Sequence, residues 1–218
     1  DDDRNVLLND FSITIHPGEK VAFVGMEHNS ITSFFDIVSE TKKPESGTYS
    51  WGQTTSHSYM GRDNSAYFNN ELTITDWLKQ YSPDQDDAYV RGFLGRMLFS
   101  GDDGLKKVRV LSGGEKVRCM LSKMMLSGAN VLILDDPTNH LDLESIESLN
   151  EGLVKFPGVV MFSSHDHEFI STIANRIIEI TPKGIIDRMM NFDDYLKDDQ
   201  VKQLRKEYYA GLNKKIRI

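Results

Sequence analysis

The chain contains 218 residues, and its 33 acidic and 25 basic side chains give a formal net charge of −8. That length accommodates one α/β domain with an inserted lobe and a sizeable core. The acidic balance excludes indiscriminate binding to nucleic-acid phosphates, those of free DNA included. No stretch is long and apolar enough to cross a bilayer. The single cysteine, Cys119, excludes an internal disulfide and favours a reducing, cytoplasmic location.

The first part of the chain predicts strands separated by turns. Residues 6–15 alternate apolar and polar side chains before a turn at residues 16–19, which is typical of an edge strand entering a hairpin. A short apolar strand then ends at Gly25. After a polar turn, residues 48–51 and 56–60 indicate two further strands.

Helical periodicity follows this strand pattern. Residues 72–78 open one helix, Pro83 breaks it, and residues 87–99 form another. We interpret the large apolar side chains of this region, such as Trp77, as the core of a helical lobe rather than as a cofactor site.

The segment from 110 to 142, VLSGGEKVRCMLSKMMLSGANVLILDDPTNHLD, predicts a helix followed by a buried strand. Ser112 caps the helix, and Glu115 three residues later completes a capping box. A run of four aliphatic residues is then typical of a parallel strand covered on both faces. Asp135 and Asp136 follow at the carboxyl end of that strand, where open α/β sheets bind their ligands.

Beyond this segment, helices and strands continue to alternate. His165 follows an apolar strand at residues 158–162. We interpret the basic tail that begins at Lys202 as a solvated helix face. The other predicted elements are a helix at residues 143–153, a helix at 169–173, a strand at 176–180 and closing helices within 191–218.

The order of LSGGE, an aliphatic strand, two acids and PTNHLD resembles the ATP-binding-cassette (ABC) superfamily. LILDD is similar to the Walker B strand of that superfamily. The sequence PTNHLD, together with the lysine that ends LSGGEK, is similar to the ABC-F branch. Those are soluble proteins with two cassettes on one chain, and many of them act on ribosomes. By this resemblance, the residues of the signature loop are Ser112, Gly113, Gly114 and Glu115, and those of the D-loop include Asn139, His140 and Asp142.

The resemblance implies an α/β fold, with an ABC-type P-loop NTPase core, an antiparallel β subdomain and an inserted α-helical lobe. It implies ATP and Mg²⁺ as cofactors, a second ABC cassette of the same chain as partner, and the ribosome as a candidate partner. We expect the chain to be a fragment of a longer protein, because it begins at Asp1 and the resemblance begins almost at once. The expected parts are the N-terminal part of the core at 1–67, the lobe at 68–110, the rest of the core at 111–190 and a helical tail at 191–218.

In this family a phosphate-binding loop, written Gly, four residues, Gly, Lys and Ser or Thr, follows the first core strand. Here Ser30 replaces the second glycine and Ile31 replaces the lysine, whose cation reaches the β- and γ-phosphates. Loss of that charge-assisted hydrogen bond, about 1.5–3 kcal/mol, predicts ATP binding weaker by roughly tenfold to a hundredfold. The alternative to weak ATP binding is that this strand, turn and helix serve only the packing of the fold. The candidate nucleotide-binding residues are Gly25, His28, Asn29, Ser30, Ile31, Thr32, Ser33 and Arg62, and none is assigned to the adenine contact.

Two more positions depart from the family pattern. Arg62 stands where a glutamine senses magnesium, and an arginine can neither accept a hydrogen bond nor bind a cation. Asp136 replaces the glutamate that acts as general base, and its side chain is one methylene shorter. By the resemblance, Asp136 and His165 (the H-loop histidine) are the candidate catalytic residues, and Thr32 and Asp135 are the candidate metal ligands.

Because ABC cassettes pair head to tail, the resemblance implies that the signature loop faces the γ-phosphate bound by the partner cassette. The sequence therefore predicts a chain whose own site is slow or non-hydrolytic but whose signature loop serves its partner. The alternatives are the nucleotide-binding domain of a membrane transporter and a docking module that has lost nucleotide altogether.

Overall fold

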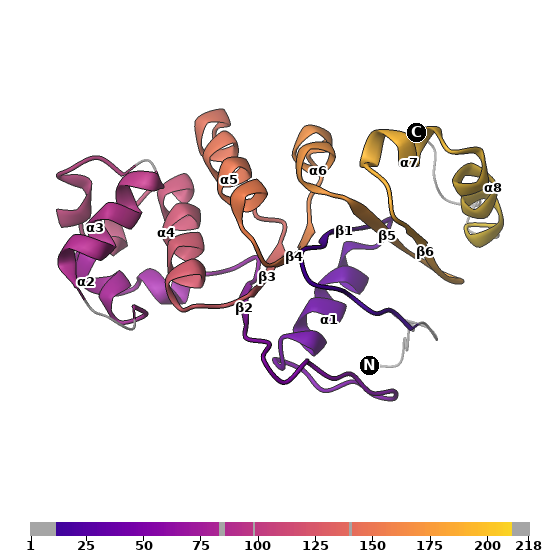
Figure 1. The fold of residues 1–218 in the computed structure, drawn as a ribbon, viewed down its shortest axis with the longest axis horizontal. Helices are drawn as coiled ribbons and strands as arrows, with labels where there is room; N and C mark the ends of the chain where they lie inside the picture. The colour runs from indigo at the N-terminus through magenta and orange to yellow at the C-terminus, as the bar shows by residue number, and fades with distance from the viewer. Residues whose placement is uncertain (1–11, 83–85, 98, 140, 211–218) are drawn as a thin grey trace.

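A single mixed sheet organises the computed structural model, which describes residues 12–82, 86–97, 99–139 and 141–210. Its strand order is β2-β3-β4-β1-β5-β6, and every neighbouring pair is parallel except β5 and β6 (Figure 1). The strands are β1 Lys20–Gly25, β2 His57–Met60, β3 Val131–Asp135, β4 Val159–Ser163, β5 Arg176–Thr181 and β6 Gly184–Arg188.

Helices cover both faces of the sheet. Helix α1 lies on one face, whereas α4 to α8 lie on the other and α2 and α3 extend beside α4 at one end (Figure 1). The helices are α1 His28–Val38, α2 Ile74–Lys79, α3 Asp87–Arg96, α4 Gly113–Leu126, α5 Leu143–Lys155, α6 His167–Ile173, α7 Phe192–Lys197 and α8 Asp199–Tyr208. Short 3₁₀ turns occupy Ser65–Phe68, Asp103–Leu105 and Val108–Val110.

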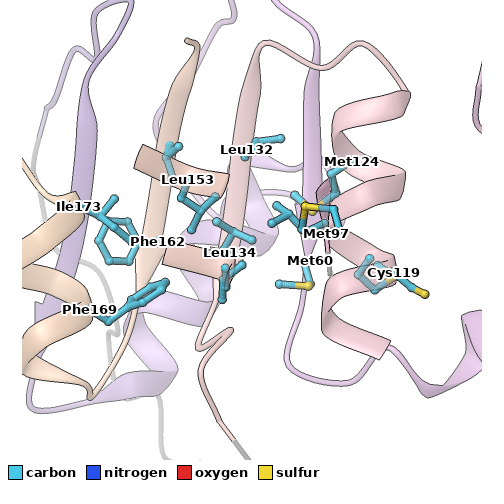
Figure 2. Packing of buried hydrophobic residues seen from close by; sticks show 14 of the residues in the cluster. Met60, Met97, Cys119, Met124, Leu132, Leu134, Leu153, Phe162, Phe169 and Ile173 are labelled. Atoms are coloured by element: carbon cyan, nitrogen blue, oxygen red, sulfur yellow. The ribbon is translucent and has the colours of Figure 1, made fainter. Parts of the chain in front are cut away.

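Two hydrophobic clusters hold these layers together. Under α1, Phe23 of β1 packs within 5.2 Å, ring centroid to ring centroid, of both Phe34 and Phe35. On the opposite face, side chains of α4, α5 and α6 meet β3 and β4, as Leu134 and Phe162 show (Figure 2). Full burial of each such side chain contributes about 1.5–3 kcal/mol, so the sheet is fixed from both sides.

Most of the predicted core elements are present, and the exceptions have local causes. No strand forms at residues 48–51, and the Trp51 side chain instead packs beside β2, where its indole donates to the carbonyl of Val38 and stacks on His57. In the predicted edge strand, residues 6–11 lie outside the described residues and residues 12–15 are not in a strand, but the turn at Pro17 and Gly18 forms. Strand β6 was not predicted; it begins at Gly184, whose φ is +136°, directly after a tight turn at residues 182–183.

The C-terminal helices are anchored to a buried carboxylate in the sheet. Glu179 of β5 is 1% exposed, and its oxygens accept hydrogen bonds from Tyr195 Oη at 2.6 Å, Tyr209 Oη at 2.8 Å and Arg205 Nε at 3.0 Å. Burial, followed by the hydrogen bond to Glu179, raises the pKa of Tyr195 well above its usual value. Part of the basic tail thus pairs with a buried acid and does not simply face solvent.

We expect Tyr195→Phe to lower the free energy of unfolding by about 1–3 kcal/mol, because one oxygen of a buried carboxylate loses its donor. Urea unfolding followed by circular dichroism measures this. Tyr89→Phe on α3 is the matched control, since Tyr89 is 47% exposed and should change stability little. Equal stability of the two variants would contradict the role given to Tyr195.

Candidate functional site

Four loops meet at one edge of the sheet. Strands β2, β3, β4 and β1 are successive parallel neighbours, so the segments after Met60, Asp135, Ser163 and Gly25 leave the sheet at the same edge. The loop after the first core strand, the loop after the two aspartates and the loop that contains His165 therefore share one edge. Ligands bind at this edge in open α/β sheets.

The buried carboxylate of Asp135 is the centre of the site. Its Oδ1 lies 2.9 Å from His28 Nε2 and accepts from Ser163 Oγ at 2.9 Å, and its Oδ2 accepts from Thr32 Oγ1 at 2.7 Å. Burial raises the pKa of Asp135, but the hydrogen bonds from His28, Thr32 and Ser163 outweigh it, so the pKa lies below its usual value. The carboxylate is thus held ionised by three protein groups.

The segment at the predicted phosphate loop is mostly helical. Only Met26 and Glu27 separate β1 from α1, which already begins at His28. Because the helix starts so early, Ile31 lies on its buried face and is 2% exposed, in the cluster with Phe23 and Phe35. The position of the family's lysine therefore belongs to the hydrophobic core.

The other predicted loop residues differ in their surroundings. Ser30 is buried, Asn29 is exposed and Ser33 is half-buried. Gly25 has a packing reason of its own, because a Cβ there would lie 2.6 Å from the carbonyl oxygen of Ile180 on β5.

Asp136 lies in a left-handed backbone conformation, with φ +52°, at the exit of β3. Its N–H donates to Ser163 Oγ at 3.0 Å, and Arg62 Nη2 lies 3.8 Å from its Oδ2. A pocket of about 80 Å³ separates the loop after β2, the loop after β3 and Val117 of α4. Sites for small organic ligands usually enclose about 300–1,000 Å³, so this pocket alone does not enclose a nucleotide.

The residues predicted as H-loop and D-loop follow β4 and β3, respectively. His165 is exposed, and its ring centroid is 5.3 Å from that of His28. Thr138 Oγ1 and Ser164 Oγ, 2.7 Å apart, join the two loops. Asn139 is exposed, and Asp142 caps α5 by accepting from Ser145 N at 2.8 Å. The predicted D-loop residue His140 lies outside the described residues.

The signature loop is fully formed, and the predicted capping box is confirmed. Glu115 Oε2 accepts from Ser112 N at 2.8 Å, and Ser112 Oγ accepts from Glu115 N at 3.3 Å. Lys106 holds the second oxygen of Glu115 at 3.1 Å. Ser112 and Gly113 are exposed at the helix start, whereas Gly114 is buried. The tip of α4 therefore lies at an exposed surface at Ser112 and Gly113.

The residues present do not fit Mg²⁺ and a triphosphate as they are arranged. Both oxygens of Asp135 already accept hydrogen bonds, and the lysine position lies in the core. Within residues 12–82, 86–97, 99–139 and 141–210, no cluster of three or more His, Cys, Asp and Glu side chains could hold a metal ion. The sequence analysis did not single out Ser163, although a polar residue ending an apolar strand was a usable signal.

Comparisons with known proteins identify the family. The family described as "ABC transporter" matches residues 8–139, more than half of the chain. A Bacillus subtilis protein named "Uncharacterized ABC transporter ATP-binding protein YkpA" is 55% identical over 206 residues, which are 94% of this chain and 38% of that protein. The chain belongs to the ABC transporter family of ATP-binding proteins. None of the helices in the described part of this cassette is both long and apolar enough to span a membrane.

Other relatives agree with this assignment. The cassette is 42% identical to the Escherichia coli O157:H7 "Probable ATP-binding protein YbiT", over 89% of this chain and 37% of that protein. It is 31% identical to the "Energy-dependent translational throttle protein EttA" of Escherichia coli K12, over 87% of this chain and 35% of that protein. The cassette therefore spans less than two fifths of the length of these relatives.

Solved structures establish the fold as the α/β ABC cassette. A cassette described as a dimer in a post-hydrolysis state bound to ADP and Pi superposes with a TM-score of 0.70 at 17% identity, covering 85% of this chain and 91% of that one. A structure named "RNase-L Inhibitor" gives a TM-score of 0.68 at 20% identity, covering 83% and 36%.

We expect Gly114→Ala to destabilise the cassette by about 1–3 kcal/mol, because the new Cβ would lie 2.5 Å from Ser145 Oγ and 3.2 Å from Ser145 Cβ on α5. Gly92→Ala is the matched control: its Cβ meets nothing within 4 Å, and a helix gains about 0.5–1 kcal/mol from that change. Thermal unfolding of both variants measures the difference. If Gly114→Ala is as stable as Gly92→Ala, α4 and α5 are not in close contact there.

Proposed function

We propose that this chain is one cassette of an ABC-F-like translation factor, whose signature loop completes the ATP site of a partner cassette while its own site is weak or non-hydrolytic. The observation that carries the proposal is a contrast within one molecule. The capping box at Ser112 and Glu115 orders an exposed helix tip, whereas the hydrogen-bonding groups of the cassette's own site are engaged with one another.

The signature side is suited to a γ-phosphate bound by a neighbour. The first N–H groups of an α-helix have no partner within the helix, and the helix dipole adds a partial positive charge there. Helix α4 runs for 14 residues from Gly113, with Ser112 exposed beside it. Such a tip attracts an anion without needing a lysine.

The cassette's own side lacks the groups that hydrolysis needs. Ile31 supplies no cation, since it lies in the core. Asp136 would orient water as general base and His165 would contact the γ-phosphate, but Arg62 already lies 3.8 Å from Asp136. In the family pattern, Thr32 and Asp135 correspond to the residues that hold Mg²⁺, whose charge would neutralise phosphate. Both residues bond each other instead, at 2.7 Å.

The translational role is supported by the relatives rather than by the surface. One relative is named a translational throttle, and this cassette covers about a third of it. With a net charge of −8, the cassette is a poor general ligand for RNA phosphates. On α8, Arg205 pairs with Glu179 and Lys202 with Asp199, so ribosome contact would come chiefly from other parts of the protein.

A docking module without nucleotide is the second candidate, and the hydrogen-bonded Asp135 favours it. The two candidates differ in one measurable property. A weak site still binds ATP in calorimetry at high nucleotide concentration, whereas a docking module shows no heat of binding. The signature function in trans is compatible with either result.

In the full-length protein, we expect Ser112→Arg to reduce ATP hydrolysis at the partner cassette by roughly a hundredfold or more, because a bulky side chain then blocks the N–H groups that stabilise the γ-phosphate. Steady-state phosphate release measures this. Ser127→Arg is the matched control, since Ser127 caps the opposite end of the same helix, where a cation is favourable. Unchanged hydrolysis in Ser112→Arg would refute the role in trans.

This cassette alone should show little ATP turnover, and Ile31→Lys should not restore it. A lysine at that position would be placed in the hydrophobic core, so we expect a loss of several kcal/mol in stability instead. Calorimetric ATP titration and urea unfolding test both statements. Ser33→Lys, half-buried on the same helix, is the control for the added charge. Brisk magnesium-dependent hydrolysis by the unaltered cassette would contradict the proposal.

A further inference from the structure

We propose that His28 takes the place of the metal ion in this cassette, so that Asp135 is a structural link between α1, β3 and β4 rather than a ligand awaiting Mg²⁺. The inference rests on the proposed function, because it explains why the cassette's own site is weak. The inference also goes beyond the proposed function, since it names the side chain, His28, that keeps Mg²⁺ from Asp135.

The geometry makes His28 a donor to the carboxylate. An ionised carboxylate only accepts hydrogen bonds, so at 2.9 Å the Nε2 atom of His28 must carry the proton that points at Asp135 Oδ1. The side chain of His28 is 16% exposed and that of Asp135 is fully buried. A charge-assisted hydrogen bond in such a buried position is stronger than one between exposed groups.

The early start of α1 is what brings His28 to this place. His28 and Thr32 are four residues apart on the helix and therefore lie on the same face. Together they reach both oxygens of Asp135, one each. If this segment formed a loop instead of a helical turn, the two side chains would not share a face.

The remaining capacity of the carboxylate is small. A carboxylate offers about four lone-pair positions, and His28, Ser163 and Thr32 use three of them. Mg²⁺ requires oxygen ligands at about 2.0–2.1 Å in near-octahedral arrangement. The His28 ring also lies 5.3 Å from that of His165, centroid to centroid, so it approaches the H-loop residue as well.

Stability in metal-free buffer tests the link. With EDTA present, we expect His28→Ala and Asp135→Asn each to lower the Tm by about 4 °C or more, given the length of 218 residues. The Tm of the double variant should be no lower than that of the less stable single variant, because both changes remove the same contact. Additive effects, or an Asp135→Asn protein as stable as the unaltered chain, would overturn the inference. His167→Ala is the control, since its ring pairs with Asp193 at the surface, 3.2 Å away.

Metal affinity is the second measurement, with Mn²⁺ as the probe in a water-proton relaxation titration. Removal of His28 should raise Mn²⁺ affinity by roughly tenfold or more, and adding Asp135→Asn should abolish the gain. His28→Gln can keep a hydrogen-bond donor near Asp135, so this variant should retain the low Mn²⁺ affinity of the unaltered chain. It shows whether a change in Mn²⁺ affinity comes from loss of the donor rather than from substitution at this position. Equal Mn²⁺ affinity in the unaltered chain and the folded His28→Ala variant would overturn the inference, and so would a His28→Gln variant that binds Mn²⁺ roughly tenfold more tightly than the unaltered chain. That result would leave the signature function untouched, because Ser112→Arg tests it separately.

Discussion

The hydrogen bonds at the carboxylate of Asp135 are the interaction on which the architecture of this cassette's site depends. A buried charge must be balanced by donors, and here three come from two segments far from Asp135 in the sequence. They fix α1 against β3 and β4, and Ser163 extends the network to the backbone of Asp136. The same carboxylate therefore contributes to the stability of this cassette and to the geometry of its site.

Local interactions explain why the signature loop was predictable. Ser112 and Glu115 are three residues apart, and their reciprocal hydrogen bonds depend on the backbone of one helical turn. The buried strands β1, β3 and β4 were equally predictable, because unbroken aliphatic runs describe parallel strands covered on both faces. Their order in the sheet, β3-β4-β1, depends on pairing between distant segments and does not follow from the runs themselves.

Contacts between distant residues explain what sequence could not predict. His28 and Asp135 are 107 residues apart, and nothing near His28 indicates that its ring reaches a buried acid. The family's loop pattern aligned Ile31 with the phosphate-binding lysine. Its side chain is buried because the helix already begins at His28, and the sequence did not indicate that start. The same holds for Glu179, whose partners lie on helices that the sequence placed but could not orient.

The close contact between α4 and α5 has a mechanical consequence. Gly114 leaves no room for a side chain beside Ser145, whose N–H donates to Asp142, the N-cap of α5. The tip of α4 and the first turn of α5 are therefore in direct contact, so a tilt of either helix has to be accommodated by the other. A neighbouring molecule that displaces the tip of α4 would consequently also load the first turn of α5.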